Sequence, residues 1–373
     1  MRKVLHLTTH LNPGGITVYV LRLMEPLRIH GFRSTVASAG GEYEYFFEED
    51  GAEVFRIDLK TKNEFHPKLL AAVPALVRLI KRERFDLIHA HTRVSQVLAC
   101  ILQKITRLPV VTTCHGFYRN RLSRRWLPAW GDRVIAISPP VADHLHEDFG
   151  VAKDKIRMVY NAVDLAELEI HYRAHLNESS PKALFGFSNT DIVVGIVARL
   201  IDEKGHEDLI RSFAELVRSN SHLKLLIVGE GRERGKLEAL CHTLGVGRDV
   251  HFSGNLTDVT GALAAIDIFA FPAVWREAFG ISVVEAMACS KPIVLTGNCA
   301  LADIIETSKS GIKVEAKNVS SLTNALKYLL EHPDVCRTMG DNAARLAREQ
   351  FSMERMSQEI ADVYNELLTR PEC

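Results

Sequence analysis

A chain of 373 residues is long enough for about two domains. Its 47% hydrophobic, 25% charged and 7% aromatic residues are typical of an ordinary soluble globular protein. The formal net charge of zero argues against a dedicated nucleic-acid-binding protein. Residues 1–168 contain 24 Lys and Arg against 18 Asp and Glu, whereas the remaining residues contain 22 against 28. The first part is therefore basic and suits an anionic partner.

The seven cysteines lie apart, and no pair has the CxxC spacing of a metal or redox site. Most sit in apolar runs, which is typical of buried reduced thiols and predicts a cytoplasmic protein. The first apolar run, at 4–9, is too short and too polar for a signal peptide. No stretch approaches the ~20 apolar residues of a membrane span.

The first half of the chain alternates strands with helices. Apolar runs predict strands at 4–9, 34–38, 53–57, 86–90, 109–114 and 132–137. Helical spacing predicts helices at 16–29, 67–81, 94–105 and 139–148. Buried strands that alternate with helices indicate a doubly wound parallel sheet, so we expect one Rossmann-like domain over 1–168.

Gly14 and Gly15 stand where the first strand passes into the first helix. Backbone N–H groups at the amino end of a helix stabilise an anion, so this loop predicts a phosphate site. An ordinary tight turn is the alternative, because two adjacent glycines are a weak indication.

Histidines follow two strand ends in this half. His115 ends the strand at 109–114, where its imidazole can donate a hydrogen bond to a hydroxyl near working pH. A purely structural histidine is the alternative. His89 and His91 flank the neighbouring strand end, but no carboxylate is spaced with them, so we do not expect a metal site there.

The segment RNRLSRRWLPAW at 119–130 combines arginines with tryptophans. This composition suits an anionic membrane surface or the phosphates of a lipid-linked acceptor, and an exposed basic helix is the alternative. The patch that we expect to contact membrane or acceptor comprises Arg119, Arg121, Arg124, Arg125 and Trp126.

Residues 164–189 are polar and lack a clean period, so they are interpreted as the connection between domains. Strands are predicted at 191–197, 223–228, 250–253, 266–271, 292–296 and 311–314, with helices between them. We therefore expect a second Rossmann-like domain over 169–351. The tail is nearly all helical, and its last helix, at about 352–373, could pack back on the first domain.

Four charged residues follow strand ends in the second half. Arg199 and Lys204 lie in the run ARLIDEKG at 198–205, where two cations can hold a diphosphate. Glu277 lies in a loop and Glu285 on the helix after it, where carboxylates can accept hydrogen bonds from paired sugar hydroxyls. Taken alone, each of these residues is more often a solvated surface residue, and it is the combination that indicates a site. Two further strand ends carry Gly229 and Gly254, which allow close approach of a ligand or simply form tight turns.

The run EAFGISVVEAMA at 277–288 closely resembles the Glu-x7-Glu signature of the family 4 retaining glycosyltransferases. Arg199 and Lys204 look like the Arg-x4-Lys pair of the same family. The amino-terminal glycine loop and His115 occur in the family order, so the resemblance covers nearly the whole chain. It implies an α/β GT-B fold, in which two Rossmann-like doubly wound parallel-sheet domains face a central cleft.

The resemblance implies transfer of a hexosyl unit from a nucleotide sugar, with a UDP-sugar as the expected donor. Arg199 and Lys204 would hold the diphosphate, and Glu285 would hold the ribose hydroxyls. Glu277 and His115 would contact the transferred sugar. The remaining donor-binding positions that it implies are Gly14, Gly15, Gly229, Gly254, Phe279 and Gly280.

Retention by double displacement needs a nucleophilic carboxylate on the sugar face, and nothing in the first domain marks one. For this family the accepted inference is a front-side route in which the leaving phosphate helps to deprotonate the acceptor. The chain has no Asp-x-Asp motif, so neither a required metal nor a cofactor is expected. The acceptor is expected to be a cell-envelope glycan, such as a lipopolysaccharide core, or a lipid-linked molecule. Peripheral contact with the inner face of the plasma membrane would follow from the arginine patch.

Three other functions remain open from the sequence. A nucleotide-sugar epimerase would use a single substrate and no acceptor. A sugar phosphorylase would need free phosphate turnover or a pyridoxal-phosphate lysine in a longer chain. A regulator would bind sugar nucleotide without turnover.

Overall fold

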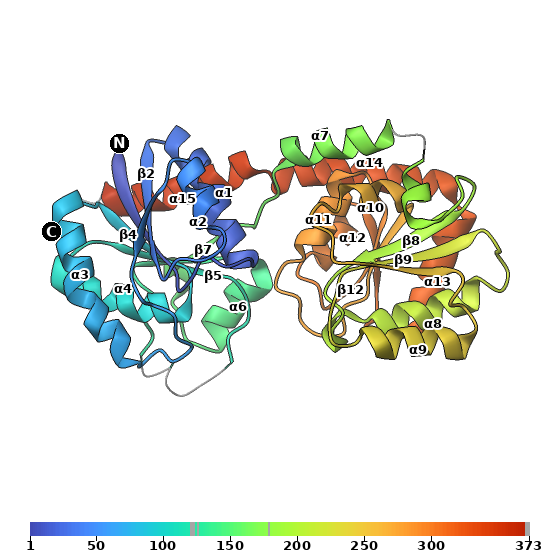
Figure 1. The fold of residues 1–373 in the computed structure, drawn as a ribbon, viewed down its shortest axis with the longest axis horizontal. Coiled ribbons are helices and arrows are strands. Elements are labelled where there is room, and N and C mark those ends of the chain that lie inside the picture. The colour runs from blue at the N-terminus through green and yellow to red at the C-terminus, as the bar shows by residue number, and fades with distance from the viewer. Residues whose placement is uncertain (120–123, 125–126, 178–179, 370–373) are drawn as a thin grey trace. The chain divides into compact units, whose positions relative to one another are not determined.

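The computed structural model describes residues 1–119, 124, 127–177 and 180–369 (Figure 1). The chain divides into two compact units. The first comprises Met1–Asn161 together with Met353–Cys373, and the second comprises Ala162–Ser352. The division falls before residue 168, because the helix that begins at Leu165 packs on helices of the second unit.

The first unit contains a seven-stranded sheet in the order β3-β2-β1-β4-β5-β6-β7, and all its neighbouring strands pair in parallel. Side chains alternate between the two faces of a strand. Leu5 and Leu7 of β1 therefore join the core under α3 and α4, while His6 between them faces the other side of the sheet. The strands are β1 (Arg2–Leu7), β2 (Phe32–Ser38), β3 (Glu53–Arg56), β4 (Leu87–Ala90), β5 (Val110–Cys114), β6 (Arg133–Ala136) and β7 (Ile156–Met158).

The helices of the first unit include the last helix of the chain. They are α1 (Gly15–Ile29), α2 (Glu44–Glu49), α3 (Pro67–Glu83), α4 (Arg93–Thr106), α6 (Pro139–Glu147) and α15 (Met353–Leu368). Helix α15 packs on α1, and two of its side chains reach strands of the sheet. Tyr364 is fully buried and its hydroxyl lies 2.6 Å from Nδ1 of His89. Glu366 forms ion pairs with Arg133 and Arg157.

The second unit contains a six-stranded parallel sheet in the order β10-β9-β8-β11-β12-β13. Phe213 of α8 and Leu326 of α13 pack over one face of it in a single apolar core. The strands are β8 (Ile192–Val197), β9 (Leu223–Val228), β10 (Val250–Gly254), β11 (Ile268–Phe271), β12 (Ile293–Thr296) and β13 (Gly311–Val314). The helices are α7 (Leu165–Leu176), α8 (His206–Leu216), α9 (Arg234–Leu244), α10 (Thr260–Ala265), α11 (Ile281–Ala288), α12 (Ala302–Thr307), α13 (Val319–Glu331) and α14 (Pro333–Gln350).

The prediction of two parallel-sheet α/β domains is confirmed, but the segment at 164–189, interpreted as the connection between domains, contains a helix that the sequence pattern did not predict. The first part of this segment is helix α7, which packs on α10 and α11. The side chain of Asp164 caps this helix by accepting a hydrogen bond from the backbone N of Glu167, at 2.9 Å. Only Leu168 of α7 is fully buried, so the helix has no apolar period that a sequence pattern could detect.

Among the helices that the structure describes, none is long and apolar enough to cross a membrane.

Candidate active site

The order of the strands places two loops of the second unit together. Strands β8 and β11 are neighbours in the sheet, although their following helices return the chain toward opposite edges. This reversal is a topological switch point, where ligands of parallel sheets bind beyond the carboxyl ends of the strands. Lys204 follows β8 and Glu277 follows β11, so the switch point brings these two predicted site residues to one place.

Lys204 and Glu277 form an ion pair between the ammonium and a carboxylate oxygen. Their side chains are largely enclosed, with exposed fractions of 16% and 22%. The ammonium also lies 5.2 Å from the centre of the Phe271 ring, within the range of a cation–π contact. The pair thus has a defined position rather than the mobility of a surface ion pair.

The backbone of the β11 loop is held by two neighbouring segments. The N–H of Val274 donates to the carbonyl of Glu203 at 3.0 Å, which ties this loop to the short helix η3 (Asp202–Lys204). The N–H of Glu277 donates to the carbonyl of Asn298 at 2.8 Å, and its carbonyl accepts from the N–H of Ala300 at 3.1 Å. Glu277 is therefore fixed by the segment that follows β12.

Gly205, immediately after Lys204, is required by both conformation and space. Its φ is +73°, and a Cβ atom there would lie 1.9 Å from the carbonyl oxygen of Pro272. The turn that carries Lys204 can therefore approach the β11 loop only with glycine at this position.

The other predicted donor-site residues lie on the same elements. Arg199 is exposed in the loop after β8, and it has no ion pair within the described part of the chain. Glu285 is half-buried on α11. Gly280 is the N-cap of that helix with φ +95°, and the buried Phe279 packs edge-on against Phe351 at 5.7 Å between ring centres.

Gly229 directly follows β9, and Gly254 is the last residue of β10. Packing alone explains why position 229 needs glycine. A Cβ at Gly229 would lie 2.1 Å from the carbonyl oxygen of Ala198. A Cβ at Gly254 would lie 3.1 Å from a carboxylate oxygen of Glu230. The requirement for glycine at 229 therefore needs no ligand to explain it.

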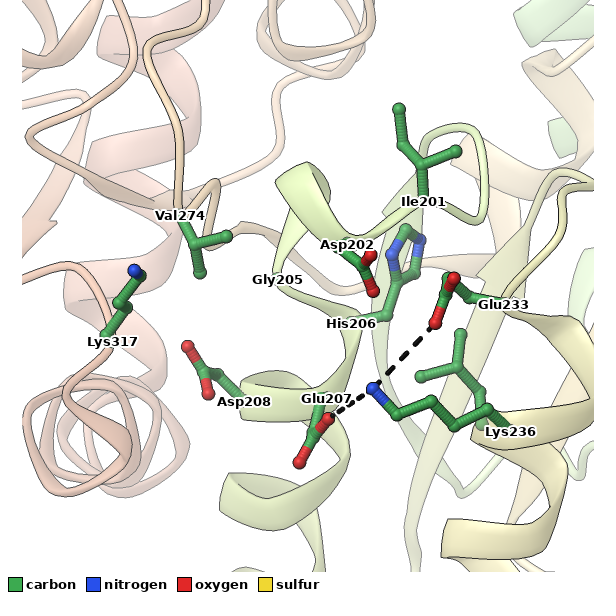
Figure 2. A pocket seen from close by; sticks show the side chains of 11 residues that line it. Ile201, Asp202, Gly205, His206, Glu207, Asp208, Glu233, Lys236, Val274 and Lys317 are labelled. Atoms are coloured by element: carbon green, nitrogen blue, oxygen red, sulfur yellow. Dashed lines mark ion pairs between the residues drawn. The ribbon is translucent and has the colours of Figure 1, made fainter.

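A pocket of about 300 Å³ is lined by residues on both sides of Lys204 in the chain, among them Asp202, Gly205 and His206 (Figure 2). His206 lies in it with only 2% of the residue exposed, and neither ring nitrogen has a hydrogen-bond partner among the described residues. Burial, followed by the charge of Lys204, lowers the pKa of His206 to about 4. Lys236 bridges Glu207 and Glu233 at the rim, at 3.1 and 3.8 Å. Sequence analysis did not single out His206, although its place after the Lys-Gly turn could have drawn attention to it.

The first unit also has a switch point, between β1 and β4. The loop after β1 leads to Gly14, which is the extended N-cap of α1, and to Gly15, the first residue of the helix. A Cβ at Gly14 would meet only the Asn12 carbonyl oxygen, at 4.0 Å, and one at Gly15 would meet nothing within 4 Å. Neither glycine is required by internal packing.

His115 lies directly after β5, and its ring meets two other rings. Its centre is 4.6 Å from that of Tyr19 and 5.7 Å from that of His91. Burial lowers the pKa of His115 to about 3, so the imidazole is neutral at pH 7. Nε2 of His115 and the hydroxyl of Tyr19 are buried without partners among the described residues.

Three further imidazoles form a buried cluster behind His115. The candidate ligand atoms of His6, His89 and His91 all lie within 4.8 Å of one another. Nδ1 of His6 lies 3.0 Å from Nε2 of His91, and Nε2 of His89 lies 2.7 Å from the hydroxyl of Thr113. Burial lowers the pKa of each ring, so the cluster is neutral at pH 7. Nδ1 of His91 is buried without a hydrogen-bond partner among the described residues. Sequence analysis paired His89 with His91 but missed His6, which is distant in the chain.

The expected arginine patch is only partly within the described residues. Arg121, Arg125 and Trp126 lie outside them. Arg119 is exposed, as expected. Arg124 is largely enclosed: its guanidinium lies 4.8 Å from the centre of the Tyr118 ring and 4.0 Å from Glu64, and 14% of its side chain is exposed.

Two family models match the chain. The model for glycosyl transferases group 1 matches residues 182–346, and the model for glycosyltransferase family 4 matches residues 13–167. Among curated proteins, an uncharacterised glycosyltransferase of Methanocaldococcus jannaschii is 25% identical, with 94% of each chain covered. The N-acetyl-alpha-D-glucosaminyl L-malate synthase of Bacillus anthracis is 26% identical, with 82% of this chain and 81% of the relative covered.

Solved structures agree in fold. A glycosyltransferase from Rickettsia africae superposes with a TM-score of 0.86 at 20% identity, covering 99% of each chain. The Anabaena protein HepE in complex with UDP-glucose superposes with a TM-score of 0.81 at 22% identity, covering 98% of this chain and 100% of HepE. The chain therefore belongs to the family 4, group 1 glycosyltransferases and has the GT-B fold.

Proposed function

We propose that this glycosyltransferase moves a hexosyl unit from a UDP-sugar to a hydroxyl of a cell-envelope glycan or a lipid-linked acceptor, with retention at the anomeric carbon. The observation that carries the proposal is the Lys204–Glu277 pair at the switch point of the second unit. In this pair Lys204 supplies a cation that can bind a phosphate, and Glu277 supplies a carboxylate that can accept hydrogen bonds from sugar hydroxyls.

In this proposal the diphosphate of the donor is bound by Lys204 and Arg199. Lys204 is held by Glu277 and by the ring of Phe271, so it offers a preoriented positive charge. The diphosphate gains negative charge as its bond to the sugar breaks, and a preoriented cation stabilises that charge most strongly in the transition state. No metal or cofactor is assigned to this step.

The hydroxyls of the donor are assigned to the carboxylates. Glu277 accepts from hydroxyls of the transferred sugar while it orients Lys204. Glu285, on α11, accepts from the two ribose hydroxyls. His115 contacts a sugar hydroxyl as a neutral imidazole, which can donate from one nitrogen and accept at the other.

Retention follows a front-side route in the proposal. The bond between the anomeric carbon and the diphosphate oxygen breaks, and its electron pair leaves with UDP. The acceptor oxygen forms the new bond on the same face of the sugar. Its proton passes to the leaving phosphate oxygen, so no protein nucleophile is used.

The assignment of a UDP-sugar is supported by HepE, whose structure contains UDP-glucose. A protein involved in lipopolysaccharide biosynthesis, WaaG, shares the fold at a TM-score of 0.69 and 19% identity, which supports only the class of acceptor proposed. A cytoplasmic location with peripheral membrane contact is part of the same proposal.

A thermal-shift panel of UDP-, GDP- and ADP-sugars, followed by transfer assays, tests the proposal. We expect UDP-sugars to raise the Tm most, and transfer to an acceptor panel to be lost in Glu277→Ala. The control is Glu331→Ala, since Glu331 is a largely exposed residue of α13 in the same unit.

Different outcomes would identify the other functions. Interconversion of UDP-sugars without an acceptor would indicate an epimerase. Donor binding without hydrolysis or transfer would indicate a regulator. A product with inverted anomeric configuration would contradict the front-side mechanism while leaving glycosyl transfer intact.

A further inference from the structure

An apolar groove of about 260 Å³ in the first unit is lined mainly by residues of α3 and α4 and of the segment before α3. Figure 1 labels these two helices. The apolar walls of the groove come from the start of α3, from one face of α4 and from the segment that follows β5. They are Phe65, Leu69, Leu70, Val97, Ile101 and Leu127. The proposed donor site of the second unit does not include this groove.

Large apolar side chains remain exposed at the groove. Phe65 is 59% exposed and Leu70 is 65% exposed. Ile105, one turn beyond Ile101 on α4, is 52% exposed and continues the apolar face. Contiguous exposed apolar surface of this kind marks a binding surface.

The charges around the groove favour an anionic ligand. Glu64 is the one carboxylate among the described lining residues, and it is neutralised by Arg93 at 2.8 Å and by Arg124 at 4.0 Å. The lining Lys104 is exposed and has no ion pair within the described ranges. The groove therefore combines apolar walls with an uncompensated cation.

The groove is connected to the carboxyl edge of the sheet. Leu127 belongs to the segment between β5 and β6, which begins with His115. Arg93, the first residue of α4, donates to the carbonyls of Leu127 and Pro128 and so holds this segment against the helix. A molecule in the groove thus contacts Leu127, which Arg93 holds against the start of α4.

We propose that the groove binds the hydrocarbon tail of the acceptor, and that the acceptor is an amphiphile with a phosphate-containing head group. This inference rests on the proposed function and narrows its acceptor to a lipid-linked molecule. Arg93 and Arg124 neutralise the lining carboxylate Glu64, and the lining Lys104 has no ion pair among the described residues, so a ligand with an apolar tail and an anionic head matches the groove in surface and charge. Each methylene that the groove removes from water strengthens binding about fourfold.

Cys100 lines the groove and gives a direct measure of its occupancy. It is half-buried, as is Cys336 of α14 in the second unit, and burial raises the pKa of both thiols. The test measures alkylation of both thiols in the full-length protein by N-ethylmaleimide, resolved by peptide mass spectrometry. The probe is farnesyl diphosphate, and inorganic pyrophosphate controls for its head group.

We expect farnesyl diphosphate to slow alkylation of Cys100 at least tenfold and to leave Cys336 unchanged, whereas pyrophosphate protects neither. Phe65→Gln and Leu70→Gln should each weaken this protection about tenfold. Both residues are mostly exposed, so the variants should fold. Ile29→Gln is the matched control, because Ile29 is a 79% exposed apolar residue of α1 in the same unit.

Two results would overturn the proposal: no protection by farnesyl diphosphate, or equal protection by pyrophosphate. In the first case, protection by anionic phospholipid vesicles would assign the groove to a bilayer. Protection of Cys100 is measured without turnover, so it tests the lipid-binding groove separately from the proposed transfer from a UDP-sugar. UDP-sugar transfer with a reactive Cys100 contradicts only the groove, whereas protection of Cys100 without UDP-sugar binding contradicts only the donor function.

Discussion

The ammonium of Lys204 and the carboxylate of Glu277 form an ion pair although the two residues are 73 positions apart in the chain. Each belongs to a loop at the switch point of the second unit, and the loops are joined by the hydrogen bond from Val274 to Glu203. A diphosphate bound by Lys204 would therefore be placed relative to Glu277 by the fold itself.

We expect Lys204→Met and Glu277→Gln each to lower kcat about 10²–10³-fold, because each removes a preoriented charge from the transition state. Steady-state kinetics with a UDP-sugar measures this. The double variant should lose less than the product of the two single losses, because the residues orient each other.

Lys236→Met is the control for this pair. It removes a lysine ion pair from the surface of the same unit, where Lys236 contacts Glu207 and Glu233. A loss of kcat as large as that in Lys204→Met would mean that the effect is general to the unit and would contradict the assigned role.

Glu285→Gln should weaken donor binding by about 1.5–3 kcal/mol, which is typical of a lost hydrogen bond to a charged group. If Glu285 binds the ribose, a 2′-deoxyribose donor should bind weakly to the wild type and lose little more in the variant. Calorimetric titration of both donors measures this coupling. Independent, additive losses would show that Glu285 contacts another part of the donor.

Gly205→Ala and Gly15→Ala should separate packing from function. Gly205 has φ +73° and no space for a Cβ, so alanine should lower the free energy of unfolding by at least about 2 kcal/mol. Gly15→Ala should leave stability unchanged or raise it by up to about 1 kcal/mol, because the site is open and alanine favours helix.

Activity then tests the role of the glycine loop. If a ligand approaches the amino end of α1, Gly15→Ala should lower kcat/KM at least about tenfold while the folded protein remains stable. Thermal unfolding and kinetics on the same preparation measure both. Full activity in Gly15→Ala would remove this loop from the proposed site.

The buried imidazoles predict a loss of stability in acid. Burial lowers the pKa values of His6 and His115 to about 3, compared with about 6.5 when unfolded. Between these values the unfolded state binds more protons, so the stability of the first unit should fall as pH drops below about 6.5.

Hydrogen exchange of β1 amides, corrected for intrinsic rates, measures this pH dependence. His6→Asn should reduce the slope of the free energy of unfolding against pH by up to about 1.4 kcal/mol per pH unit, because it removes one titrating imidazole. An unchanged slope would show that other groups dominate. Since His115 stays neutral above pH 5, it should add no inflection to the kcat/KM profile between pH 5 and 9.

Glu366→Gln should loosen α15 from the first unit by about 1–2 kcal/mol, since it breaks the pairs with Arg133 and Arg157. The hydrogen bond from Arg133 is the largest cause that lowers the pKa of Glu366 to about 2. Its contribution is thus complete above about pH 4.5 and is lost as pH falls through about 2. Faster exchange of α15 amides at pH 7 would support this anchoring, and unchanged exchange would contradict it.

The sequence by itself determined the class of the fold. The strand at 223–228 is predicted to the residue, because its apolar run reflects burial on both faces of a parallel sheet. The bounds of the edge strand at 311–314 are also predicted to the residue, although Lys313 is exposed. The sequence also identified Lys204 and Glu277, since their motifs are local and short. Helix α7 could not be predicted, because it buries only Leu168 and depends on packing against α10 and α11.

Only the tertiary structure decided which of these residues meet. The order of β8 and β11 brings Lys204 to Glu277, and no local pattern encodes the neighbours of a strand. The same holds for His6 beside His91 and for the groove between α3 and α4, whose walls come from three separate segments. Local spacing determines which side chains share one element, whereas contacts between elements depend on how the whole sheet is ordered and packed.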